Sequence, residues 1–241
     1  MRPLSIIFRR ELGAYLSSPL GYIIAAAALL TTGILFQWEG LGGEPKLSSD
    51  VLTQFFYVAS GVTMCAAILL SMRLVAEERQ EGTLVLLSTS PASDLAIVLG
   101  KFLSAFALLA GMLALTLYMP LLIFVNGKVA VAEIAAGYLG LFLLGGAVLA
   151  IGLFASALAR LQIVALLVGG LITAVLVLIY HLAGIVDPPL STVFEKLALY
   201  HLHFHGFMTG LIELESVVYY AAVIYFFLLL ATKTLEAKRW Q

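Results

Sequence analysis

Three histidines alternate with other residues near the C-terminal end of the chain, at His201, His203 and His205. In an extended strand, alternate side chains point to the same side, and three imidazoles on one side suit a zinc ion. No acidic or thiol-bearing residue lies immediately beside them to complete a ligand set. We therefore expect a structural role at a membrane interface, where imidazoles are well accommodated, with a metal site as the weaker alternative.

The sequence lacks the usual motifs of catalysis and nucleotide binding. It holds no His-Glu-x-x-His metal motif, no Gly-x-Ser-x-Gly elbow and no Gly-x-x-x-x-Gly-Lys-Ser/Thr phosphate loop. We therefore expect a non-catalytic chain that binds no cofactor itself. The remaining enzymatic hypothesis is an intramembrane enzyme that uses His181, near the end of an apolar run, together with the histidines at 201–205.

The composition places the chain in a membrane. Of its 241 residues, 62% are hydrophobic and only 11% are charged, whereas soluble domains carry about a quarter charged residues. A net charge of −1 gives no general attraction to nucleic acid. The single cysteine, Cys65, lies in an apolar run, and we expect it to be a small buried residue.

The apolar runs predict an all-α membrane protein with six transmembrane helices, each near the ~20 residues that cross a bilayer. Residues 1–18 precede them with apolar residues at helical spacing and several arginines, which predicts an amphipathic helix at the membrane interface; an ordinary charged flank is the alternative. Residues 19–241 form the transmembrane domain. The predicted spans are Leu20–Trp38, Phe55–Met72, Ile97–Val125, Ile134–Ala159, Ile163–Val186 and Val217–Leu235.

The distribution of basic residues predicts the orientation. With the N-terminus in the cytoplasm, the inner segments carry ten of the 13 Lys and Arg residues and the outer loops carry three, so both termini are expected inside. The largest outer segment is residues 187–216. There, Thr192 and Glu195 fit the capping box of a short helix, and Phe207–Leu214 fits a second helix at the membrane surface.

Segment 73–101, between the second and third spans, is the longest polar interruption on the predicted inner side. Gly82 suits the end of a helix that continues from the second span, and Thr83 then begins a short helix that carries Leu84 and Leu87. Ser90 and Pro91 suit the start of the helix that enters the third span. A short helix tied to two spans could transmit force from a soluble partner. The alternative is a solvated charge cluster that acts only as a stop-transfer signal during membrane insertion.

Several motifs together resemble the permeases of ABC-2 type transporters, and the outer stretch from His203 to Tyr220 resembles the branch of that family named for gliding motility. The N-terminal part of the resemblance is Phe8-Arg9-Arg10-Glu11-Leu12. The remaining motifs are Glu77-Glu78-Arg79-x-x-Gly82-Thr83-Leu84, Thr89-Ser90-Pro91 and Val98-Leu99-Gly100-Lys101-Phe102.

The resemblance implies a dimeric permease, with a second copy or a related chain, that binds two separate ABC ATPase subunits; these would hold ATP and Mg²⁺. It places the interfacial helix at Arg9, Arg10 and Glu11. It also implies a coupling helix after the second span, with ATPase-coupling residues Glu77, Glu78, Arg79, Gly82, Thr83, Leu84, Leu87 and Pro91. Many relatives carry Glu after Gly-Thr-Leu, whereas this chain has Val85, and many carry Arg where it has Thr209.

The sequence therefore predicts a permease subunit in a bacterial inner membrane that couples ATP hydrolysis in another chain to export or envelope work. The alternative is a membrane module that passes force to an extracytoplasmic protein with little or no transport, because the spans contain almost no polar path. An apolar interior suits a lipid-linked substrate.

Overall fold

A computed structural model describes residues 3–40, 47–83, 93–127, 129–187 and 189–239. Those residues form helices and no strand, so the predicted all-α fold is confirmed for them. A π-helical turn, Phe36–Gly40, extends the end of α2. The α-helices are α1 Pro3–Ser17, α2 Pro19–Leu35, α3 Ser48–Ser71, α4 Ala76–Gln80, α6 Asp94–Thr116, α7 Tyr118–Asn126, α8 Val131–Leu158, α9 Gln162–Ala183, α10 Leu190–Leu197, α11 His201–Met208 and α12 Leu214–Arg239.

All six predicted spans correspond to helices. Within the described residues, six helices are long and apolar enough to cross a membrane. The predicted bounds were too narrow at the second span: α3 begins at Ser48, seven residues before Phe55, because its first two turns are polar and hydropathy does not register them. The third span is interrupted at Leu117, where a turn separates α6 from α7.

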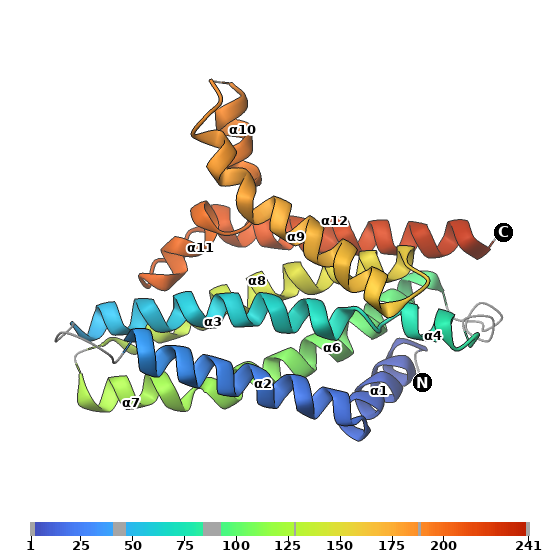
Figure 1. Cartoon of the computed structure of the whole chain (residues 1–241), viewed down its shortest axis with the longest axis horizontal. Helices are drawn as coiled ribbons and strands as arrows, with labels where there is room; N and C mark the ends of the chain where they lie inside the picture. Colours follow the sequence, from blue (N-terminus) through green and yellow to red (C-terminus); the bar gives the residue numbers. More distant parts are fainter. Residues whose placement is uncertain (1–2, 41–46, 84–92, 128, 188, 240–241) are drawn as a thin grey trace.

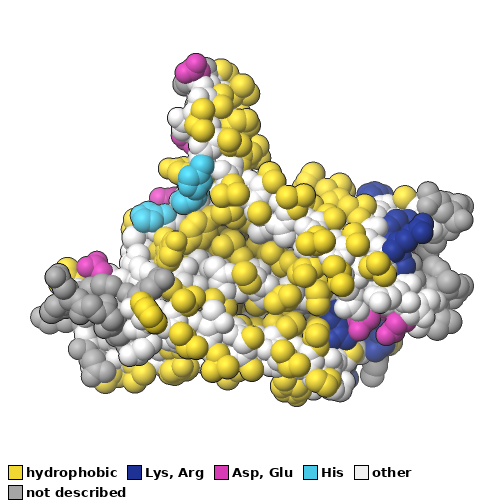
Figure 2. All heavy atoms as spheres, viewed as in Figure 1, with side chains coloured by type: hydrophobic (Ala, Val, Ile, Leu, Met, Phe, Trp, Pro, Cys, Tyr) yellow, Lys and Arg dark blue, Asp and Glu magenta, His cyan; other side chains and the backbone are white. Residues whose placement is uncertain are grey.

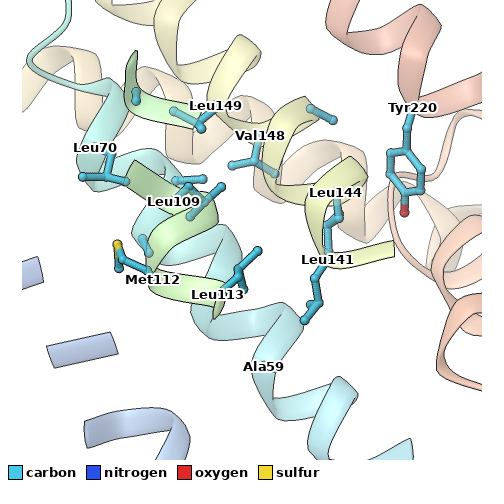
Figure 3. Close-up of a cluster of buried hydrophobic side chains, with 14 of the residues drawn as sticks. Ala59, Leu70, Leu109, Met112, Leu113, Leu141, Leu144, Val148, Leu149 and Tyr220 are labelled. Carbon is cyan, nitrogen blue, oxygen red and sulfur yellow. The ribbon is translucent and has the colours of Figure 1, made fainter. Parts of the chain in front are cut away.

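Helix α8 is the centre of the bundle. It is the most buried of the six long helices, and it packs against α3, α6, α9 and α12. Figure 3 shows Leu144 and Val148 of α8 beside Leu109 and Leu113 of α6, with Tyr220 of α12 on the other side. The small residues of α8 permit this close packing: a Cβ on Gly152 would overlap the Ser71 side chain of α3. A movement of α3 or α6 would therefore displace side chains that contact α8 directly.

The two chain ends lie at the same end of the bundle. The N-terminus, α4 and the C-terminal end of α12 are together in Figure 1, and α10 projects from the bundle nearer its other end. Figure 2 shows Lys and Arg side chains gathered at the end that holds the termini, and hydrophobic side chains over the flank between the ends. This distribution is typical of a protein whose long helices cross a bilayer.

In segment 187–216 the short helix predicted first is present but its predicted start was wrong, and the position predicted for the second helix was wrong. Helix α10 begins at Leu190 with Pro189 at its N-cap position, so Thr192 lies inside the helix and caps nothing. The second helix is α11, His201–Met208, and not Phe207–Leu214. It ends at a turn in which Gly210 adopts a φ of +84°, which few residues other than glycine accept. The sequence pattern did not predict that Gly210 would end this helix.

Candidate functional site

The second span does not run straight into the charged segment, because the chain turns between α3 and α4. Ser156 of α8 fills this turn. Its hydroxyl accepts hydrogen bonds from the backbone N–H groups of Val75 and Ala76, each at 3.0 Å, and donates one to the carbonyl of Met72 at 3.0 Å. These residues are at the buried base of α4. A single side chain of the central helix therefore fixes where α4 leaves the bundle.

Helix α4 ends at Gln80, and Gly82 takes the C′ position that stops it, as the sequence predicted. This glycine has a φ of +74°, and its N–H donates to the carbonyl of Arg79 at 3.3 Å. The N–H of Thr83 donates to the carbonyl of Glu78 at 2.9 Å. The pair of bonds is a Schellman motif, which closes the last turn of a helix and redirects the chain. Gly82 thus sets the direction in which the chain leaves α4.

Replacing Gly82 with Ala is expected to destabilise the protein by about 1–2 kcal/mol, because an L side chain disfavours a left-handed backbone. A Cβ there would meet no atom within 4 Å, so the effect is one of backbone conformation alone. Gly13→Ala is the matched control, since a Cβ at that helical position also meets nothing within 4 Å. Chemical unfolding in detergent micelles should show a loss for Gly82→Ala and none for Gly13→Ala; equal effects would contradict the backbone argument.

Beside α4 lies a network of four charged residues, Arg10, Glu11, Glu78 and Lys101, which we call the charged network. The Lys101 Nζ of α6 lies 3.1 Å from Glu11 Oε1 of α1 and 3.0 Å from Glu78 Oε1 of α4. Arg10 Nη2 lies 2.6 Å from Glu11 Oε1 and 2.8 Å from Glu78 Oε1. Two cations thus share two carboxylates, and three helices meet through them.

The charged network is largely out of contact with solvent. The side chain of Lys101 is 1% exposed and those of Glu11 and Glu78 are each 14% exposed, whereas Arg10 is 56% exposed. Burial alone would raise the pKa of Glu11, but the charges of Lys101 and Arg10 outweigh it and lower that pKa. The bond to Glu11 raises the pKa of Arg10. At Glu78, by contrast, burial outweighs the same cations and raises the pKa. Glu11, Glu78 and Lys101 are thus buried ionisable groups whose charge states depend on one another.

Helix α1 can reach the charged network because α6 offers it a glycine. A Cβ on Gly100 would stand 2.8 Å from Ile7 Cγ2, so only glycine allows this approach. Ile7 is buried there against Ile97 of α6. Two adjacent residues of α6 therefore hold α1: Gly100 allows its close approach, and Lys101 forms an ion pair with Glu11.

A second set of bonds fastens the junction of α1 and α2 to the end of α3. The Tyr15 hydroxyl donates to the carbonyl of Leu70 at 2.8 Å, and the Arg73 guanidinium lies over the Tyr15 ring, 5.2 Å from its centroid. Arg73 also donates to Glu77 through two nitrogens, at 2.8 and 2.9 Å, and to Ser18 at 3.1 Å. Burial raises the pKa of Tyr15, so its hydroxyl stays a donor.

The structure brings together some of the predicted coupling residues and separates others. Arg10, Glu11 and Glu78 join the charged network, whereas Glu77 pairs with Arg73, and no bond or ion pair is seen for Arg9 within the described chain. Arg79 instead donates to the C-terminal carbonyls of α8, the shortest bond being 2.7 Å to Ala159. Leu84, Leu87, Pro91 and Val85 lie outside the described residues, so the predicted coupling helix is not seen.

Sequence reasoning missed two residues that hold the site together. Lys101 is one of seven charged residues in segment 73–101. Ser156 belongs to a run of small residues in the fourth span, with Gly145, Gly146, Ala150 and Gly152, which predicts close helix packing and no functional site. A lysine directly after a glycine in an apolar run is a usable signal for Lys101, because a charge there needs a partner. The helix entering the third span was also placed wrongly: it begins at Asp94, with Ser93 at its N-cap accepting from the N–H of Ala96, while Ser90 lies outside the described residues.

The three alternating histidines are in helix α11, so they do not share a side as they would in a strand. His203 is buried, stacks on Tyr219 with ring centroids 3.8 Å apart, and bonds to the carbonyl of Lys196. His201 stacks on Tyr180, and its ring centroid lies 5.2 Å from the ring centroid of His181, whereas His205 is exposed. Burial lowers the pKa of both His201 and His203. Within the described part of the chain, no group of three potential ligands could hold a metal ion.

An apolar cavity of about 610 Å³ lies between α2, α3, α9 and α11. Its walls extend along α3 from Tyr57 to Leu69, a rise of roughly 18 Å at 1.5 Å per residue. Tyr200 and His201 line it at the end near α11. Cys65 is in the wall and exposed, so the expectation that it is buried was wrong; apolar surroundings in sequence did not reveal which face of α3 it occupies.

Six long apolar helices, a central helix rich in small residues and charges gathered at one end describe a multi-pass membrane protein. The family described as ABC-2 family transporter protein matches residues 39–232. The chain belongs to this family, and is therefore a membrane transport component whose family implies an ABC ATPase as partner. A comparison with curated proteins finds no match.

Proposed function

We propose that this chain is the permease subunit of an ATP-driven transporter, and that the charged network couples it to a separate ATPase. The observation that carries the proposal is the burial of Lys101 between Glu11 of α1 and Glu78 of α4. Charges are rarely taken out of solvent in a membrane protein without a functional reason. Here they join the helices on both sides of residues 84–92, the segment expected to meet the ATPase.

The proposed mechanism is mechanical. An ATPase that displaces segment 84–92 pulls on α4 at one end and on α6 at the other. Because Lys101 and Arg10 bind α4, α6 and α1 together, the three helices move as one body. Ser156 passes the movement of α4 to the buried helix α8, which contacts four of the other long helices. ATP and Mg²⁺ are held by the ATPase, and this chain performs no chemistry.

The cavity favours transport over a pure force relay. Its volume of about 610 Å³ is in the range of small-molecule sites, and its apolar walls suit a lipid-linked or otherwise amphiphilic substrate. A relay without substrate needs no such space. A role in passing force to an extracytoplasmic protein, suggested by the likeness to the gliding-motility branch, is the second candidate.

Further parts of the proposal concern assembly and placement. The permease forms a dimer, with a second copy or a related chain, and lies in a bacterial inner membrane with both termini in the cytoplasm. Ten of the 13 basic residues then lie on the cytoplasmic side, which supports this orientation. Helix α1, with the exposed Arg9 and Arg10, lies at the inner membrane surface.

Affinity purification of the full chain from its native membranes tests the proposal. An ATPase with a phosphate loop should co-purify, and the complex should hydrolyse ATP. Glu78→Gln should lower that hydrolysis several-fold while the complex stays assembled, because it removes the two ion pairs that join α4 to Lys101 and to Arg10. Lys233→Gln, which alters an exposed ion pair with Glu236, should leave hydrolysis unchanged. Absence of any ATPase, or equal effects of both changes, would refute the coupling role.

A further inference from the structure

Three cations gather at the C-terminal end of α8, at some distance in sequence from one another: Arg79 of α4, Arg160 in the turn between α8 and α9, and Lys238 of α12. We call them the basic cluster. Arg79 Nη2 and Lys238 Nζ each lie 3.0 Å from the carbonyl oxygen of Ala157, so the two nitrogens are at most about 6 Å apart. Arg160 directly follows Ala159, whose carbonyl accepts a hydrogen bond from Arg79 Nη1 at 2.7 Å, so its charge adds to the same end of α8.

The basic cluster carries more positive charge than its surroundings neutralise. The carbonyls at the end of a helix attract cations, but with only about half an elementary charge. Among the described residues, none of the three cations forms an ion pair with a carboxylate; the ion pairs of the described chain belong to Arg10, Arg73, Lys101 and Lys233. Figure 2 shows basic side chains on this end of the molecule. The excess charge calls for an anion.

The position of the basic cluster selects the kind of anion. Arg160 precedes α9 by two residues and Lys238 closes the sixth long apolar helix, so the cluster stands at the boundary of the apolar region. Exposed apolar side chains adjoin it directly, with Leu161 51% and Ile163 71% exposed. An acidic protein surface would pair with the cations but would leave these apolar side chains without apolar contacts. A phospholipid supplies a phosphate for the cations and acyl chains for the apolar residues.

We propose that the basic cluster binds the phosphate headgroup of an anionic phospholipid, whose acyl chains lie along the start of α9. Arg160 binds the phosphate, together with those N–H groups of Arg79 and Lys238 that do not donate to α8. Both of these already donate to α8, so a bound lipid would tie α4 and α12 to the end of the central helix. The site is separate from the charged network and does not depend on the proposed ATPase.

The test uses native mass spectrometry of the full chain in detergent micelles, titrated with phosphatidylglycerol or with phosphatidylcholine of the same acyl chains. The wild type should retain phosphatidylglycerol preferentially. Arg160→Gln should weaken phosphatidylglycerol binding about fivefold, the value of one basic residue at a membrane surface, and Lys238→Gln should do likewise. Phosphatidylcholine binding should not change. Arg160 bonds to no described group, so its replacement leaves the fold intact.

Lys233→Gln is the matched control, because it removes the same charge from the same end of α12 but from an exposed ion pair. If it weakens phosphatidylglycerol binding as much as Arg160→Gln does, the effect is one of general charge and the site is refuted. Displacement of the lipid by glycerol phosphate would identify a soluble phosphate site instead. Unchanged lipid binding in both cluster variants, with loss of a co-purifying ATPase, would assign the cluster to a protein partner.

Discussion

Lys101→Met is expected to lower the free energy of unfolding by about 3–5 kcal/mol, the usual cost of removing one partner from a buried ion pair. The lysine is 1% exposed, and without it Glu11 and Glu78 face each other with only Arg10 to compensate. Methionine keeps the length of the side chain and removes the charge. Chemical unfolding of the full chain in detergent micelles measures the loss.

Two further variants separate charge from packing in this prediction. Lys233→Met, at an ion pair whose members are 65% and 42% exposed, should cost less than about 1 kcal/mol. The double variant Lys101→Met/Glu78→Gln restores the charge balance and should recover most of the lost stability. If the double variant is as unstable as Lys101→Met, the loss comes from packing, and the electrostatic account of the network is wrong.

Ser156→Ala is expected to cost about 2–4 kcal/mol, although it removes a single oxygen. The N–H groups of Val75 and Ala76 both bond to that oxygen, and these residues are 1% and 0% exposed. Without it, two buried donors have no partner, and each such donor costs about 1–3 kcal/mol. Because the turn between α3 and α4 depends on these bonds, the variant should also become more sensitive to protease at α4.

Thr173→Val is the control for Ser156→Ala. Thr173 is also buried, but its hydroxyl bonds only to the carbonyl of Gly169 in its own helix, so its loss should cost less than about 1 kcal/mol. The same unfolding measurement applies to both. A comparable small loss in the two variants would mean that the Val75 and Ala76 donors find other partners, and that Ser156 does not fix the turn.

The fold was largely predictable because a membrane imposes strong and local constraints on sequence. Six apolar runs of sufficient length define six helices without knowledge of their contacts. The stop at Gly82 was equally local, since a glycine after a charged turn needs no tertiary information. Errors came where an element is polar or short: the first turns of α3, the start of α10 and the position of α11 leave little trace in hydropathy.

The site was less predictable because its key contacts join residues far apart in sequence. Glu78 was selected through family resemblance, but nothing local says that it shares Lys101 with Glu11, which is 90 residues from that lysine. Ser156 gave the same difficulty: its hydroxyl is used by a turn of another helix. The exposure of Cys65 could not be predicted either, because its apolar neighbours in the sequence do not indicate that it lines a cavity.

The central claim is that α1, α4 and α6 move as one body, and a cross-link between α1 and α6 tests it most directly. A Cβ at Gly100 lies 3.0 Å from Ile7 Cβ, so Ile7→Cys and Gly100→Cys can form a disulfide after a small outward shift; Cys65→Ser removes the native thiol. The cross-link is combined with Arg10→Gln/Glu11→Gln, which removes one charge of each sign and detaches α1 from the charged network, while the Lys101–Glu78 pair still joins α6 to α4. ATP hydrolysis by the co-purified complex should be low when reduced and recover on oxidation. Equal hydrolysis in both states would contradict the account.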